Sequence, residues 1–121
     1  MKDYIKISTK KDFGSVSVTL NIKDEKVVGI GQKMKAINEN ADMNGYNWEA
    51  LLNYYLDEHF AEVSAGMGSD ANAGKYVAYY KLNPQNEKKA EQLAAIMEDL
   101  IENEQKLYDI VTNNADEIDW E

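Results

Sequence analysis

The amino-acid sequence predicts an α+β fold, in which a small antiparallel sheet of about four strands packs with three to four helices as a single pair of layers. Hydrophobic and polar residues alternate over residues 15–22, which is the period of a strand with one solvated face. Residues 48–60 and 84–113 instead repeat their hydrophobic residues at the spacing of a helix. The strand-like segments come in neighbouring pairs and no linker divides residues 1–121, so we expect one domain.

Four segments account for the predicted strands. Residues 4–8 form the first, and a hairpin connection at 10–14 joins it to the strand at 15–22. Residues 75–82 are rich in tyrosine and valine, which favours a strand. We expect residues 63–67 to pair with it across a turn-rich connection.

The segment after the second strand has two interpretations. Its apolar residues have helical spacing over 26–38, which predicts a helix. Gly29 and Gly31 each weaken a helix by up to about 1 kcal/mol relative to alanine. A strand at 27–30 followed by a shorter helix is therefore the alternative.

The helix at 48–60 follows an Asn-Gly turn, and Asn47 is placed to accept a free backbone N–H at its start. On a helical wheel Trp48, Leu52 and Tyr55 fall on the apolar side, whereas Tyr54 leans away from it. We therefore expect the first three side chains in the core and Tyr54 at the surface.

The last helical region, 84–113, begins with Asn83 as a cap and a proline at the first helical position. Glu104 falls within its apolar stripe, and burying a lone carboxylate is unfavourable. We therefore expect a break near 102–104 or a bend that lets Glu104 reach water. The tail, 116–121, alternates apolar residues with acids, and it either forms a short edge strand or docks its tryptophan.

Composition limits the classes of function. The net charge is −9, and residues 84–121 carry most of it, with 11 acidic residues and three lysines against 11 and ten in residues 1–83. All 13 basic residues are lysine, and an acidic chain without arginine is a poor nucleic-acid binder. No cysteine, leader-like segment or long apolar run occurs, so we expect a cytoplasmic protein that does not bind membranes.

No motif predicts catalysis, a metal or a cofactor. His59 is the single histidine, and without a second imidazole or thiolate we interpret it as structural. Residues 40–51 resemble part of a calcium-binding loop, but they begin with asparagine and end with leucine in place of the bidentate glutamate. A turn leading into a capped helix is the better interpretation. We therefore predict no enzyme activity.

Two surface features predict a protein partner. One is an acidic stripe along the last helical region, at spacings of 7, 4 and 7 residues, with Asp99 beside it. The other is a set of tyrosines, because tyrosine pairs an apolar ring with a polar tip and is enriched at interfaces. Of the adjacent Tyr79 and Tyr80, one must face the core. The predicted contact residues are Glu91, Glu98, Asp99, Glu102, Asp109, Tyr54, Tyr79 and Tyr80.

Residues 44–56, which contain Trp48 and two adjacent tyrosines, resemble the bacterial polymorphic-toxin immunity proteins, in particular the immunity protein 51 family. Residues 73–80, 98–108 and 116–120 support the resemblance, which covers about 40–121. It implies a small cytoplasmic protein that binds a cognate secreted toxin domain, often a nuclease, and blocks it. It implies no particular contact residues.

Three hypotheses follow. The leading one is a stoichiometric toxin inhibitor, which we expect to be monomeric. The second is a generic acidic binding or adaptor domain, and the gene next to this one would distinguish it. The third is a carboxylate-dependent hydrolase, because a chain with 22 acidic residues always allows two to meet in space.

Overall fold

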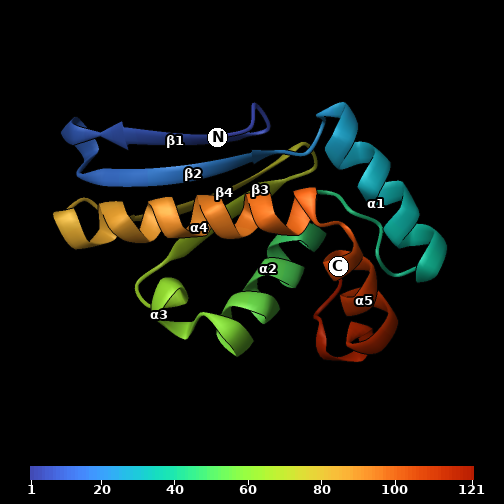
Figure 1. Ribbon diagram of the computed structural model, residues 1–121. Helices are drawn as coiled ribbons and strands as arrows, with labels where there is room; N and C mark the ends of the chain where they lie inside the picture. Colours follow the sequence, from blue (N-terminus) through green and yellow to red (C-terminus); the bar gives the residue numbers. More distant parts are fainter.

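The computed structural model describes residues 1–121 and contains a four-stranded antiparallel sheet with helices packed on one face, which confirms the predicted α+β class (Figure 1). The strand order is β1-β2-β4-β3, so β1 and β3 are the edges. The strands are β1 (Ile5–Lys10), β2 (Ser15–Asn21), β3 (Gly68–Asn72) and β4 (Lys75–Lys81). Helices α2 and α4 pack against the sheet, and the other face carries no helix.

The inner face of the sheet provides much of the core. Val16, Val18 and Leu20 of β2 are fully buried, and their neighbours Ser15, Ser17 and Thr19 are only partly buried. On β4, the inward positions are Tyr76, Ala78 and Tyr80. The alternation predicted for 15–22 is therefore confirmed, because one face of each strand packs on helices and the other meets solvent.

Five α-helices and two short 3-10 turns complete the chain. They are α1 (Glu25–Ile37), α2 (Gly45–His59), α3 (Ala61–Ser64), α4 (Pro84–Glu102) and α5 (Gln105–Asn113), with η1 (Lys11–Phe13) and η2 (Ala115–Glu117). None of the helices combines the length and the hydrophobicity that a membrane span requires.

Residues 26–31, for which the sequence allowed either a helix or a strand, belong to the helix α1. Asp24 caps the helix by accepting the backbone N–H of Lys26 at 2.9 Å. Gly31 is buried, and a Cβ built there would lie 3.1 Å from the Cβ of Met43. The glycine that weakens the helix locally thus allows a close approach between α1 and the loop that follows it.

Helix α2 begins earlier than predicted. Its N-cap is Asn44, whose side chain accepts the backbone N–H of Asn47 at 2.9 Å, so the prediction of Asn47 as the cap was wrong. The reason is the packing of Gly45, since a Cβ there would lie 1.8 Å from the carbonyl oxygen of Asn72. Only glycine lets the helix start so close to the β3–β4 turn. Asn47 then lies inside the first turn and is buried.

The predicted strand at 63–67 was wrong. Val63 belongs to the short helix α3, where its carbonyl accepts the hydroxyl of Tyr80 at 2.7 Å. The strand that pairs with β4 is β3, five residues later, although glycine, serine and aspartate are poor strand formers. Pairing with β4 overrides that local preference, and the ring of Tyr79 lies over the bare backbone of Gly68.

The predicted break in the last helical region is confirmed. Asn83 caps α4 through the backbone N–H of Asn86 at 2.8 Å, and the helix ends at 102. Glu104 stays partly exposed between α4 and α5, where its Oε1 is 3.3 Å from the Nζ of Lys33 and 3.2 Å from the hydroxyl of Tyr108. The break lets α5 turn against α1 (Figure 1).

The tail docks its tryptophan and forms no edge strand. Ile118 is buried, and the indole N–H of Trp120 donates to the carbonyl of Ala115 at 3.1 Å.

The prediction that the aromatic side chains Trp48 and Tyr55 of α2 lie in the core is confirmed in part. Trp48 is 1% exposed, whereas Tyr55 is only partly buried, with its ring 4.8 Å from that of His59.

Candidate partner-binding surface

The acidic stripe predicted along one helix is divided by the break. Glu91 and Glu98 lie on α4, and Glu102 is its last residue, whereas Asp109 lies on α5 after the chain has turned. The four carboxylates therefore do not form one straight row, which is the consequence of the break expected near 102–104. Asp109 accepts a hydrogen bond from the side chain of Gln105 at 2.9 Å.

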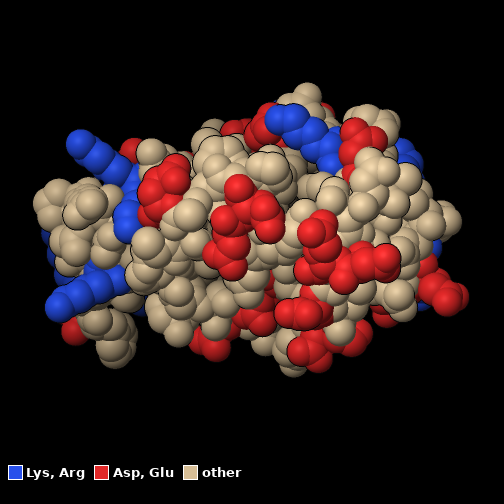
Figure 2. All heavy atoms as spheres, turned by 90° about the horizontal axis from the view of Figure 1, so that it is seen from below, with Lys and Arg blue, Asp and Glu red and all other residues tan.

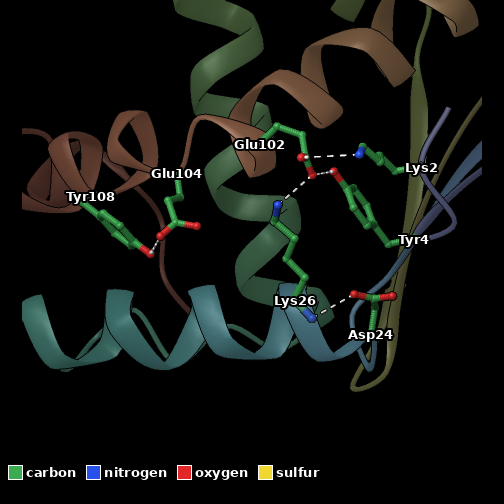
Figure 3. Close-up of polar contacts among 7 residues, drawn as sticks. All are labelled: Lys2, Tyr4, Asp24, Lys26, Glu102, Glu104 and Tyr108. Carbon is green, nitrogen blue, oxygen red and sulfur yellow. Dashed lines mark hydrogen bonds and ion pairs between the residues drawn. The ribbon is translucent and has the colours of Figure 1, made fainter.

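Glu102 joins three parts of the chain (Figure 3). Its Oε2 accepts the Tyr4 hydroxyl at 2.6 Å and lies 3.0 Å from the Nζ of Lys26, while Oε1 is 3.7 Å from the Nζ of Lys2. The hydrogen bonds from Tyr4 and Lys26 lower the pKa of Glu102, and burial together with this carboxylate raises the pKa of Tyr4. Glu102 therefore ties the end of α4 to the segment just before β1 and to the start of α1.

Asp99 is also paired. Its carboxylate accepts hydrogen bonds from Lys106 and from the side chain of Asn103, and the Lys106 bond is the main cause of its lowered pKa. The same bond raises the pKa of Lys106. Two of the five predicted acidic contact residues, Asp99 and Glu102, thus have their charge compensated by lysines. Glu91 and Glu98 make no ion pair.

The three predicted tyrosines have different surroundings. Tyr79 is 41% exposed on the helix-free face of the sheet, as expected for one of the adjacent pair. Tyr80 is 1% exposed, and its burial raises its pKa to about 12. Tyr80 is therefore excluded as a contact residue and is a correction to the predicted set. Tyr54 is partly buried and donates to Oε2 of Glu117 at 3.2 Å.

The structure also forms an acidic groove that the sequence reasoning did not identify. It is an open hollow of about 380 Å³ between the outer face of α2 and the tail. Four uncharged side chains line it, Tyr46, Ala50, Asn53 and Tyr54. The remaining lining residues are all acidic: Glu49, Asp57, Glu58, Glu117, Asp119 and Glu121. We call this set of ten residues the acidic groove.

No lysine compensates the acidic groove. The five ion pairs in the structure, which involve Asp42, Asp99, Glu102 and Glu104, lie elsewhere. Figure 2 views the molecule from below, the side of α2 and α3, and shows acidic side chains across this face with lysines toward its edges. The groove is therefore a concentrated negative field on a surface that is free to meet a partner.

Contacts within the fold hold the two walls of the groove together. The backbone N–H of Glu121 donates to the side chain of Asn47 at 2.7 Å, which attaches the tail to the first turn of α2. Glu117 accepts hydrogen bonds from Tyr54 of α2 and from Asn114 at 3.2 and 3.0 Å. Helical spacing places Glu49, Asn53 and Asp57 on one side of α2, but the meeting with the tail is a tertiary contact.

The groove acids are spread along its walls. No three acidic or histidine side chains in the structure converge closely enough to hold a metal ion. His59 is exposed at the end of α2. The arrangement suits a surface that carries several positive charges spaced along it, such as a basic protein.

A comparison with protein families identifies the family of this chain. The model of the family described as immunity protein 51 matches residues 7–116, which is most of the chain. The chain belongs to the immunity protein 51 family. The match confirms the resemblance and extends it from residue 40 back into β1, so the first strands are part of the shared region. Glu117, Asp119 and Glu121 of the groove lie beyond its end.

Searches of curated protein sequences and of solved structures found no match. Membership of the immunity protein 51 family suggests neutralisation of a toxin.

Proposed function

We propose that this protein is a cytoplasmic immunity protein that binds a cognate toxin domain in its acidic groove and blocks it stoichiometrically. The observation that carries the proposal is the groove itself, an open hollow lined by six carboxylates and two tyrosines without a lysine among them. Family membership supports a toxin as the class of partner.

The charges of the groove suit a toxin that acts on nucleic acid. A nuclease needs a basic surface to hold phosphates, and a groove lined with carboxylates competes for that surface. The negative field attracts the basic partner over a distance and raises the association rate. Once the partner is bound, Tyr46, which is 41% exposed, and Tyr54 provide apolar contact area near the carboxylates.

The test uses the toxin domain encoded beside this gene, in an inactivated form for binding and an active form for inhibition. We expect a one-to-one complex in titration calorimetry, and loss of toxin activity at equimolar protein. Raising the salt from about 50 to 300 mM is expected to weaken binding about tenfold or more, because salt screens exposed charges.

Two other outcomes would contradict the proposal. If the neighbouring gene encodes no toxin and its product still binds, the protein is an adaptor and not an inhibitor. A complex whose affinity does not respond to salt would place the contact away from the acidic groove.

A further inference from the structure

The outer edge of β1 offers unpaired backbone groups. The N–H of Asn21 donates to the carbonyl of Tyr4 at 2.8 Å, which sets the phase of the β1–β2 ladder. In an antiparallel pair, hydrogen-bonded positions alternate with positions that face the other way. Lys6, Ser8 and Lys10 therefore bond β2. Ile7 and Thr9 direct their N–H and C=O groups away from it, and no other backbone hydrogen bond in the structure uses these groups.

This edge lacks several of the features that usually protect an edge strand from pairing, although it carries Lys6 and Lys10. The register of β1 with β2 is continuous over six residues, without a bulge or a proline. No element lies beyond β1 in the sheet (Figure 1). An extended segment of another chain could therefore add to the sheet as a fifth strand.

A hollow lies beside the same edge, on the inner face of the sheet. It has a volume of about 230 Å³, and Ala94 and Ala95 of α4 form part of its lining because their side chains are small. Glu91 and Glu98, the two predicted contact residues of α4 that make no ion pair, also line it. The complete lining is Met1, Ile7, Glu91, Ala94, Ala95 and Glu98.

We infer that β1 is a strand-addition site for an extended segment of the toxin domain, with an apolar side chain in this hollow and lysine or arginine beside Glu91 and Glu98. The inference rests on the proposed function and adds a second contact to the acidic groove. Inward side chains of an added strand occur at every second residue. The expected segment therefore alternates basic and apolar residues on one of its faces.

Charge argues against a second copy of this chain as the occupant. Antiparallel pairing of two β1 edges would bring Lys6 and Lys10 of both copies together on the outer face of the sheet. It would also bring the Glu91 and Glu98 carboxylates of both copies toward each other at the inner face. Like charges placed opposite one another destabilise strand pairing, whereas a basic segment of the toxin meets the two glutamates favourably.

The first test removes one outward N–H. Thr9→Pro deletes an N–H that faces away from β2, and proline is tolerated on an edge strand at such a position. The matched control is Ala71→Pro on β3, at the opposite edge, where the N–H faces away from β4 by the same reasoning. We expect Thr9→Pro to weaken toxin binding about tenfold and Ala71→Pro to leave it unchanged. Thermal unfolding of both variants verifies that they fold.

The second test measures, in the unsubstituted protein, whether the outward N–H groups of β1 become hydrogen-bonded when the toxin domain binds. Amide hydrogen exchange is measured by NMR with and without the toxin domain. The N–H groups of Ile7 and Thr9 are expected to exchange about 100-fold more slowly in the complex, because they become part of a ladder. The N–H of Ala71 is expected to show no change.

The outcomes separate the two proposals. A toxin complex with no protection at Ile7 and Thr9, and with full affinity after Thr9→Pro, overturns strand addition and leaves the proposed function standing. The absence of any complex overturns the proposed function and, with it, this inference. Protection of Ile7 and Thr9 that persists when Ala95→Arg fills the hollow with positive charge would exclude the hollow as the side-chain contact.

Discussion

The stripe of acids along α4 and α5 and the acidic groove differ in how much of their charge is available to a partner. Helical spacing draws attention to the stripe, yet Glu102 and the neighbouring Asp99 are bonded to lysines, and Asp109 lies on another helix. The groove is assembled from α2 and the tail, and it contains no lysine. Its carboxylates are therefore the stronger candidates for contact with a basic partner.

The difference shows that the spacing of acidic residues in a sequence does not determine which of their charges are available to a partner. Glu102 has the correct spacing for a solvated stripe, but Lys2 and Lys26 reach it from the other end of the chain. Its charge thus holds the fold together. Asp119 has no such lysine near it, and it faces α2 across the groove. Whether a carboxylate serves stability or binding depends on neighbours that are distant in sequence.

The largest expected effect comes from reversing charge in the groove. Glu58→Lys combined with Asp119→Lys changes two exposed side chains that make no hydrogen bond, so the fold should be unaffected. We expect the affinity for the toxin domain to fall about 100-fold, because like charges would then face each other. Titration calorimetry measures the change.

The control for this prediction carries the same change of charge outside the groove. Glu39→Lys with Asp70→Lys alters two exposed acids in the loop before α2 and on β3. Equal losses of affinity in the two double variants would show that net charge, and not the groove, determines binding.

Reversing the charge of Glu102 is expected to lower the thermal stability of the fold. Glu102→Lys removes the acceptor of the Tyr4 hydroxyl and places a third positive charge beside Lys2 and Lys26. We expect the melting temperature to fall by roughly 5 °C, measured by circular dichroism. Glu91→Lys, an exposed change on the same helix without an ion pair to break, should leave it nearly unchanged. A stable Glu102→Lys variant would mean that the charge of this residue is not structural.

The contribution of Glu102 should also depend on pH. Its hydrogen bonds hold its pKa below the ordinary value of 4.5, so the carboxylate stabilises the fold above that pH. The stability is lost as the pH falls from 4.5 through the lower folded-state pKa. The difference in unfolding free energy between the natural protein and Glu102→Gln should therefore be present at pH 7 and disappear in acid. Urea unfolding between pH 7 and pH 3 measures it, and a constant difference would contradict the assignment.

The smallest effect is expected at Asp109. It belongs to the predicted stripe but lies on α5, and its hydrogen bond is to the neighbouring Gln105. Asp109→Lys should change toxin affinity less than about threefold, through the long-range field alone. A loss as large as that of the groove variant would restore the stripe as a binding surface.

Local signals predicted the elements whose own residues determine them. The alternation at 15–22, the Asn83 cap and the break forced by Glu104 all appear in the structure, because each depends on neighbours within one or two turns. The start of α2 and the position of β3 were missed. Both are set by contacts across the fold, Gly45 against Asn72 and the pairing of β3 with β4.

The residues of the candidate site were likewise predicted where local spacing sets their position, and missed where a tertiary contact sets it. The sequence indicated that one of Tyr79 and Tyr80 faces out, and the structure shows that it is Tyr79. A helical wheel of residues 48–60 also puts Asn53 and Asp57 on the side opposite the apolar residues. It could not indicate that Glu117 and Asp119 would lie opposite them, because the tail is attached through Asn47 and Trp120.

The sequence by itself determined the fold class, the excess of negative charge and the family, since composition, periodicity and characteristic runs are properties of the chain in any conformation. Only the tertiary structure decided which of the charges are free. A carboxylate is available to a partner when no lysine of the same molecule reaches it. That depends on distances of a few ångströms between segments as far apart as residues 2 and 102.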